Sequence, residues 1–220
     1  MNTPEGFRPV ANVIWNLFLA FLPVILANIT LWVSRLKIGR LSRRFLIAVC
    51  LIIWAVLLPN TCYLFTEWRH YLDAVTETQM YDRALVSHSA MAHLLGLTLF
   101  YACYSGAGLL AFFLAIWPLD KRLRVRHPTS AFIARFIGFP LCSLGVYLGL
   151  IHRFNSWDLI HKHLMHTIIE ISAQALSSRF SSAIILAFAV FLGVLYWGFD
   201  IWMDGFRFRE ASRRGNSRKS

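Results

Sequence analysis

The sequence predicts an all-α fold, an integral membrane helical bundle of about five transmembrane helices with one amphipathic helix at its outer face. Of the 220 residues, 57% are hydrophobic and only 15% are charged, whereas soluble domains are about 45–50% apolar. The apolar residues form long runs, most of them close to or above the ~20 residues that a helix needs to cross a bilayer. Lysine and arginine cluster between these runs, as in the loops of membrane proteins.

Candidate membrane spans occupy residues 10–33, 45–58, 90–117, 131–151 and 182–203. The first run is longer than the core of a signal peptide, so we interpret it as a retained span. The second run is short, and we expect its helix to extend to Leu41 at one end and through residues 57–65 at the other. Because Pro59 lacks a backbone N–H, we expect it to break or kink this helix.

The positive charges predict the orientation, because lysine and arginine are retained on the cytoplasmic side of a membrane. Fifteen of the 22 lysines and arginines lie in residues 35–44, 121–126 and 207–219, which the five spans place on one side. We therefore expect the N-terminus outside and the C-terminus in the cytoplasm. Because the positive charges cluster between apolar runs, we expect the net charge of +11 to reflect membrane topology, with membrane lipids and not nucleic acid as partners.

Residues 158–178 are amphipathic. Apolar and polar side chains each recur every three or four residues, on different helical faces: Ile160, Leu164, Ile168, Ile171 and Ala175 on one, and His163, His166, Glu170, Gln174 and Ser177 on the other. A sixth span here would move the basic tail outside, so we expect a helix lying in the outer interface. Residues 1–205 are then a single transmembrane domain, and residues 206–220 a basic, disordered cytoplasmic tail.

Two polar segments share the outer face in this topology: LPNTCYLFTEWRHY at residues 58–71 and HRFNSWDLIHKH at residues 152–163. Polar groups at membrane depth are costly unless they are paired or functional. We predict a polar site between the second and fourth spans with candidate residues Asn60, Tyr63, Glu67, Arg153, Asn155, Trp157 and Asp158. A structural explanation stays open, in which the asparagines cap helices, the charged residues pair, and the tryptophan anchors the interface.

Other chemistry is less well supported. The i, i+3, i+7 spacing of His163, His166 and Glu170 makes them weak candidates for a metal site, and we assign no metal or cofactor. Asp158 with His161, or Glu67 with His70, offers a general base and the residue that orients it, but no nucleophile motif accompanies either pair. Whether the chain is an enzyme therefore stays open.

Small residues predict close helix packing. Gly145 and Gly149 form a G-x-x-x-G motif, and the sequence SGAG occupies residues 105–108. We expect these positions to let helices of the bundle approach one another, with a homodimer or a partner membrane protein as a second possibility.

Several motifs in order resemble those of one family. They are WNLFLA at residues 15–20 followed by Pro23, LPNTCYL at 58–64, the pair Tyr81 and Asp82, and GVYLGLIHRFNSWD at 145–158. Together they resemble a family of uncharacterised bacterial inner-membrane proteins classed as a domain of unknown function, from which the chain departs at Glu67, where aspartate is more usual. The resemblance covers nearly the whole chain and implies a multi-span protein of the bacterial inner membrane.

From the polar site, we expect a multi-pass membrane protein that binds or processes a lipid-linked or periplasmic small molecule. One alternative is an assembly or scaffold protein for a membrane complex. A transporter is the second alternative, although the middles of the first, second and fifth spans are almost purely apolar.

Overall fold

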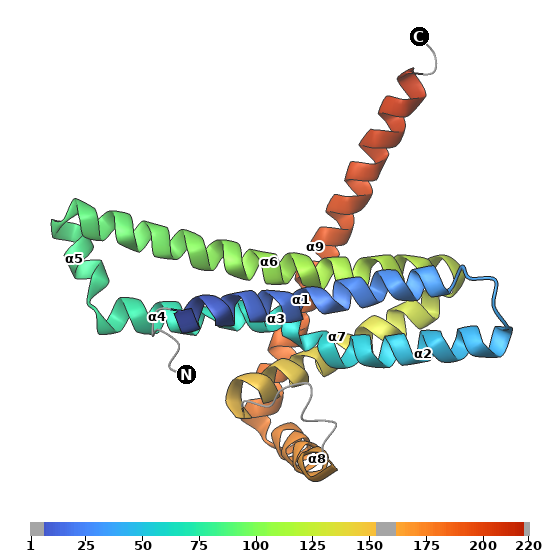
Figure 1. The fold of residues 1–220 in the computed structure, drawn as a ribbon, viewed down its shortest axis with the longest axis horizontal. Coiled ribbons are helices and arrows are strands. Elements are labelled where there is room, and N and C mark those ends of the chain that lie inside the picture. The colour runs from blue at the N-terminus through green and yellow to red at the C-terminus, as the bar shows by residue number, and fades with distance from the viewer. Residues whose placement is uncertain (1–6, 153–161, 218–220) are drawn as a thin grey trace.

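The computed structural model describes residues 7–152 and 162–217, and these residues form helices without any strand (Figure 1). The helices are α1 (Phe7–Val33), α2 (Arg40–Leu57), α3 (Pro59–Thr66), α4 (Trp68–Glu77), α5 (Met80–Val86), α6 (His88–Arg126), α7 (Pro128–His152), α8 (Lys162–Ser177) and α9 (Arg179–Ser217). Within this part of the chain, five helical stretches are long and apolar enough to cross a membrane: Ala11–Val33, Arg40–Glu77, His88–Arg126, Pro128–Ile151 and Arg179–Arg207. The predicted all-α membrane bundle is confirmed.

Helices α2, α3 and α4 follow one another as an interrupted rod. As expected, the first interruption falls at Pro59, which begins α3, while Leu58 keeps helical dihedrals and its N–H donates to the Trp54 carbonyl at 2.9 Å. The chain turns back after α4 at Gln79, whose φ of 48° is left-handed. Helices α4, α5 and the start of α6 therefore form a hairpin that extends away from the rest of the bundle (Figure 1).

Helix α6 is longer than the predicted span. Its 39 residues correspond to about 58 Å at 1.5 Å per residue, about twice the ~30 Å hydrocarbon core of a bilayer. The basic cluster at residues 121–126, which the sequence suggests is a loop, forms its last turns. Lysine and arginine favour helices and suit the negative end of the helix dipole.

Helices α8 and α9 complete the chain. In α8, Ile168 and Ala175 are buried while His166 and Glu170 are exposed, as the amphipathic pattern predicts. Helix α9 crosses the long helices obliquely (Figure 1) and continues past the predicted end of the fifth span to Ser217. Residues 206–217, for which the sequence predicts disorder, are helical in the structure.

Glycines let α6 and α7 approach α3 from two sides. A Cβ atom on Gly108 would lie 2.6 Å from the Thr61 carbonyl oxygen, and one on Gly145 would lie 2.5 Å from Cγ of Pro59. Real Cβ atoms essentially never come this close to other heavy atoms. The predicted close packing is confirmed at Gly108 and Gly145, whereas Gly106 of the same SGAG sequence has nothing within 4 Å of its Cβ position. The two close contacts place α3 in the centre of the bundle.

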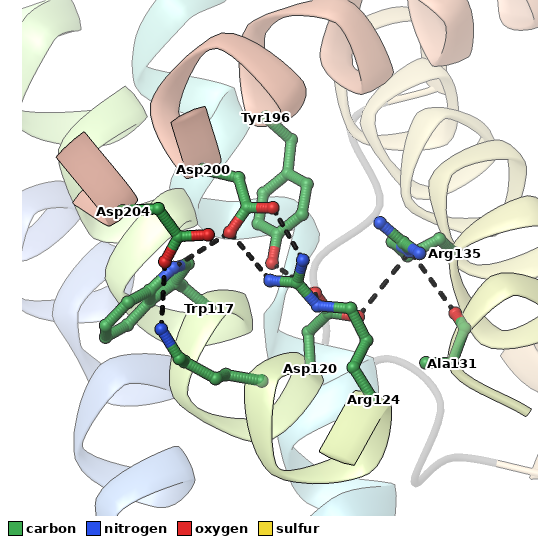
Figure 2. A network of polar contacts seen from close by, with 9 residues as sticks. Trp117, Asp120, Arg124, Ala131, Arg135, Tyr196, Asp200 and Asp204 are labelled. Carbon is green, nitrogen blue, oxygen red and sulfur yellow. Dashed lines mark hydrogen bonds and ion pairs between the residues drawn. The ribbon is translucent and has the colours of Figure 1, made fainter. Parts of the chain in front are cut away.

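A buried ionic network joins α9 to α6 and α7 (Figure 2). Arg124 on α6 makes two hydrogen bonds to the Asp200 carboxylate of α9, at 2.6 and 2.7 Å, and its Nε lies 3.0 Å from Asp120. Asp120 also accepts a 2.7 Å hydrogen bond from the hydroxyl of Tyr196, and lies 3.5 Å from Nε of Arg135 on α7. Buried charges are costly unless they are paired, so these contacts fix how α9 sits on its neighbours.

We predict that Gly108→Ala lowers the free energy of unfolding by about 1–3 kcal/mol, because the added methyl group overpacks the contact with α3. The measurement is thermal unfolding of the purified protein in detergent. Gly106→Ala, two residues away on α6 with nothing within 4 Å of its Cβ position, is the control and should be neutral or stabilising by up to about 1 kcal/mol. Equal melting temperatures for the two variants would contradict the close approach of α6 and α3.

We also predict that Asp200→Asn destabilises the protein by roughly 2 kcal/mol, because it weakens two charge-assisted hydrogen bonds from Arg124 and leaves Asp120 as the only carboxylate paired with this guanidinium among the described residues. The control is Asp204→Asn, on the same helix, which removes the more exposed 2.9 Å pair with Lys121 and should cost less than about 1 kcal/mol. Both variants are compared in the same detergent unfolding experiment. If Asp200→Asn lowered the free energy of unfolding no more than Asp204→Asn does, the network would not be what holds α9 against α6 and α7.

Candidate functional site

A cavity of about 590 Å³ lies between α1, α3 and α7, bordered by the first turn of α4 and by α8. We call it the Glu67 cavity. Its lining residues are Asn12, Asn16, Leu19, Val56, Pro59, Asn60, Tyr63, Leu64, Thr66, Glu67, Arg69, His70, Gly145, Val146, Leu148, Gly149, Leu150 and Ile168. Polar and apolar side chains both contribute, so the lining is amphipathic.

The local structure of α3 explains why its polar residues share the cavity. Asn60, Tyr63 and Glu67 are spaced i, i+3, i+7, which places them on one face of a helix. Glu67 occupies the junction between α3 and α4 with near-helical dihedrals, so the face continues across it. The same residues that the sequence singles out in the second span therefore line one wall.

The electrostatics of the cavity centre on Glu67, whose side chain is only 16% exposed. Its Oε2 lies 3.8 Å from Nε2 of His70, which is itself 60% exposed. This distance exceeds that of a hydrogen bond, so the imidazole leaves acceptor capacity on the carboxylate. Arg69, nearby on α4, lies 4.0 Å from Asp73 in a half-exposed pair. The carboxylate is thus the best shielded charge of the cavity.

The opposite walls come from α1 and α7. Asn12 and Asn16 are one turn apart on α1, with Leu19 one turn deeper, and α7 contributes Val146 and Leu148. The α1 asparagines were not predicted from the sequence, although amides within an apolar run are a recognisable signal because they are costly at membrane depth. The cavity accordingly lies between the first, second and fourth spans, and not between the second and fourth alone.

The predicted site residues fall into two groups. Asn60, Tyr63 and Glu67 lie together in the cavity. Residues Arg153, Asn155, Trp157 and Asp158 lie outside the described residues, so their contribution stays a prediction. They follow directly after α7, the helix that forms one wall of the cavity.

Two of the weak metal candidates on α8, His166 and Glu170, do not line the cavity. Nδ1 of His166 lies 3.4 Å from Oε1 of Glu170, and both side chains are highly exposed. The side chain of His163 lies outside what the structure describes. Among the described residues, no three histidine, cysteine, aspartate or glutamate side chains come together as ligands for a metal ion.

The cavity is better suited to binding than to covalent chemistry. Glu67 is an acceptor, and the amides of Asn12, Asn16 and Asn60 both donate and accept. Among the lining hydroxyl groups, that of Thr66 donates a 2.7 Å hydrogen bond to the backbone carbonyl of Tyr63. Its proton is therefore already used in a hydrogen bond within α3. The arrangement can therefore recognise a polar group by hydrogen bonds while apolar residues contact the remainder of a ligand.

A family model described as Protein of unknown function (DUF1361) matches residues 15–195. No curated protein and no solved structure matches the chain. The matched segment begins in α1 and ends in α9, and contains every residue of the Glu67 cavity except Asn12.

Proposed function

The chain belongs to the family of unknown function DUF1361, and we propose that this multi-pass membrane protein binds a lipid-linked or periplasmic small molecule in the Glu67 cavity. The observation that carries the proposal is the mixed lining, in which a shielded carboxylate and several amides meet an apolar wall. The cavity volume of about 590 Å³ falls within the roughly 300–1,000 Å³ typical of small-molecule sites.

The distribution of the lining residues favours an amphiphilic ligand. Asn12 and Asn16 lie in the first half of α1, and Glu67 lies at the junction of α3 with α4. The apolar residues Leu19 of α1, Val56 of α2 and Val146 of α7 lie nearer the basic end of the bundle. A ligand with a polar head and an apolar tail matches this order. Because Glu67 accepts hydrogen bonds, the head should carry donors such as an amine or sugar hydroxyl groups.

We further propose that the protein lies in a bacterial inner membrane with the cavity near the outer surface. The turns that join α1 to α2 and α6 to α7 lie at one end of the bundle (Figure 1), together with the basic residues 35–44 and 121–126. Of the polar cavity residues, Asn12 and Asn16 lie toward the opposite end of α1, while Asn60, Tyr63 and Glu67 lie beyond the opposite end of α2, on α3 and its junction with α4. The positive-inside rule then supports a cytoplasmic basic end and an outer polar mouth.

We predict that the full-length protein, purified in a mild detergent, carries a defined amphiphile detectable by native mass spectrometry, and that Glu67→Gln lowers its occupancy about tenfold or more. The substitution removes a charge-assisted hydrogen bond worth about 1.5–3 kcal/mol. The control is Glu77→Gln, at the exposed end of α4 and outside the cavity lining. Equal occupancy in both variants, or a wild-type protein without any bound amphiphile, would contradict the proposal and turn attention to a scaffold role.

The orientation gives a separate prediction. Green fluorescent protein fused after Ser220 should fluoresce in a bacterial host, because the C-terminus is expected in the cytoplasm, where this reporter folds. Alkaline phosphatase at the same position should be inactive, since it requires the periplasm. The reverse pair of results would place the cavity mouth on the cytoplasmic side.

A further inference from the structure

A second pocket, of about 530 Å³, lies at the basic end of the bundle, between the end of α1, the last turns of α6 and α9. We call it the Trp117 pocket. Its cationic lining consists of Arg35, Lys121, Arg122, Arg126 and Arg207. No carboxylate belongs to the lining given by the described residues, so the pocket is strongly and one-sidedly positive.

Three described carboxylates near this end are already paired. Asp120 and Asp200 pair with Arg124, which is not a lining residue, and Asp204 pairs with Lys121 at 2.9 Å. In the described part of the chain, these ion pairs leave the four lining arginines without a counter-charge. An anion bound in the pocket would supply the counter-charge for these arginines.

The indole of Trp117 organises the pocket. Trp117 is 8% exposed, and its Nε1 donates to Asp200 at 3.1 Å (Figure 2), so the ionic network fixes the orientation of the ring. The guanidinium of Arg207 lies 4.3 Å and the ammonium of Lys121 lies 5.0 Å from the ring centroid. Both distances are within the range of cation–π attraction. Two cations from different helices are thereby held over one buried ring.

The position of the pocket relative to the membrane indicates which kind of anion it can bind. Arg35 lies two residues beyond the end of α1, and Arg122 and Arg126 follow the apolar part of α6. The pocket therefore lies where apolar runs end, which is the level of lipid phosphates. Leu31 and Val125 also line it and give apolar contact beside the charges.

We propose that the Trp117 pocket binds the phosphate group of an anionic phospholipid. The planar guanidinium fork matches phosphate oxygens in a bidentate geometry, and basic pockets between transmembrane helices are suited to anionic headgroups. The pocket is separate from the Glu67 cavity, because the two share no lining residue and lie at opposite ends of the bundle.

The test is a titration of the delipidated full-length protein in detergent with phosphatidylglycerol or phosphatidylcholine, read by native mass spectrometry. The pocket variant is Arg122→Gln with Arg126→Gln, and the matched control is Arg40→Gln with Arg44→Gln, which removes the same charge from α2 outside the pocket lining. We expect wild type and control to bind phosphatidylglycerol in preference to phosphatidylcholine. The pocket variant should bind phosphatidylglycerol about tenfold or more weakly.

Two further arms complete the test. Arg35→Gln, in the turn after α1 and outside α6, should also weaken phosphatidylglycerol binding, and it carries the test if the α6 variant does not fold. Excess inorganic phosphate should not displace the lipid. Equal losses in the pocket and control variants would show diffuse attraction to the basic end, and displacement by inorganic phosphate would assign the site to a free anion. Either result would overturn the proposal.

Discussion

The paired charges of Asp120, Arg124 and Asp200 are the interaction on which the arrangement of this bundle depends. Apolar surface alone holds membrane helices together weakly, because lipid tails are as apolar as the helices themselves. Two hydrogen bonds from one guanidinium to one carboxylate are directional, so they fix the rotation of α9 as well as its position. The network also orients Trp117, which gives the basic end of the bundle its defined pocket.

The other end is organised by shape instead of charge. Gly108 and Gly145 allow α3 to sit between α6 and α7, and α1 then closes the third side of the Glu67 cavity. Helices α6 and α7 take part in both regions, since they also carry Asp120, Arg124 and Arg135 of the ionic network. A bundle pinned at one end and closely packed at the other holds a preformed cavity, which lowers the entropy cost of binding a ligand.

Much of this fold could be predicted because its strongest signals are local. Apolar runs gave the spans, Pro59 marked the break between α2 and α3, and helical spacing grouped Asn60, Tyr63 and Glu67. The ionic network was missed, because Asp120 and Asp200 are far apart in sequence and pairing across helices leaves no periodic pattern. The basic residues 121–126 follow an apolar run, which is typical of a loop, so the sequence does not indicate that Arg124 lies in a helix. Asn12 and Asn16 do carry a signal, as amides within an apolar run, but nothing local shows that α1 meets α3.

The central claim is that the Glu67 cavity is the binding site of an amphiphile. An electron cryo-microscopy map of the full-length protein, extracted with its native lipids into nanodiscs, tests it most directly. We expect elongated density between α1, α3 and α7, with its polar end within hydrogen-bond distance of Glu67. A cavity that holds only water, or that is closed by the side chains of α1 and α7, would contradict the claim.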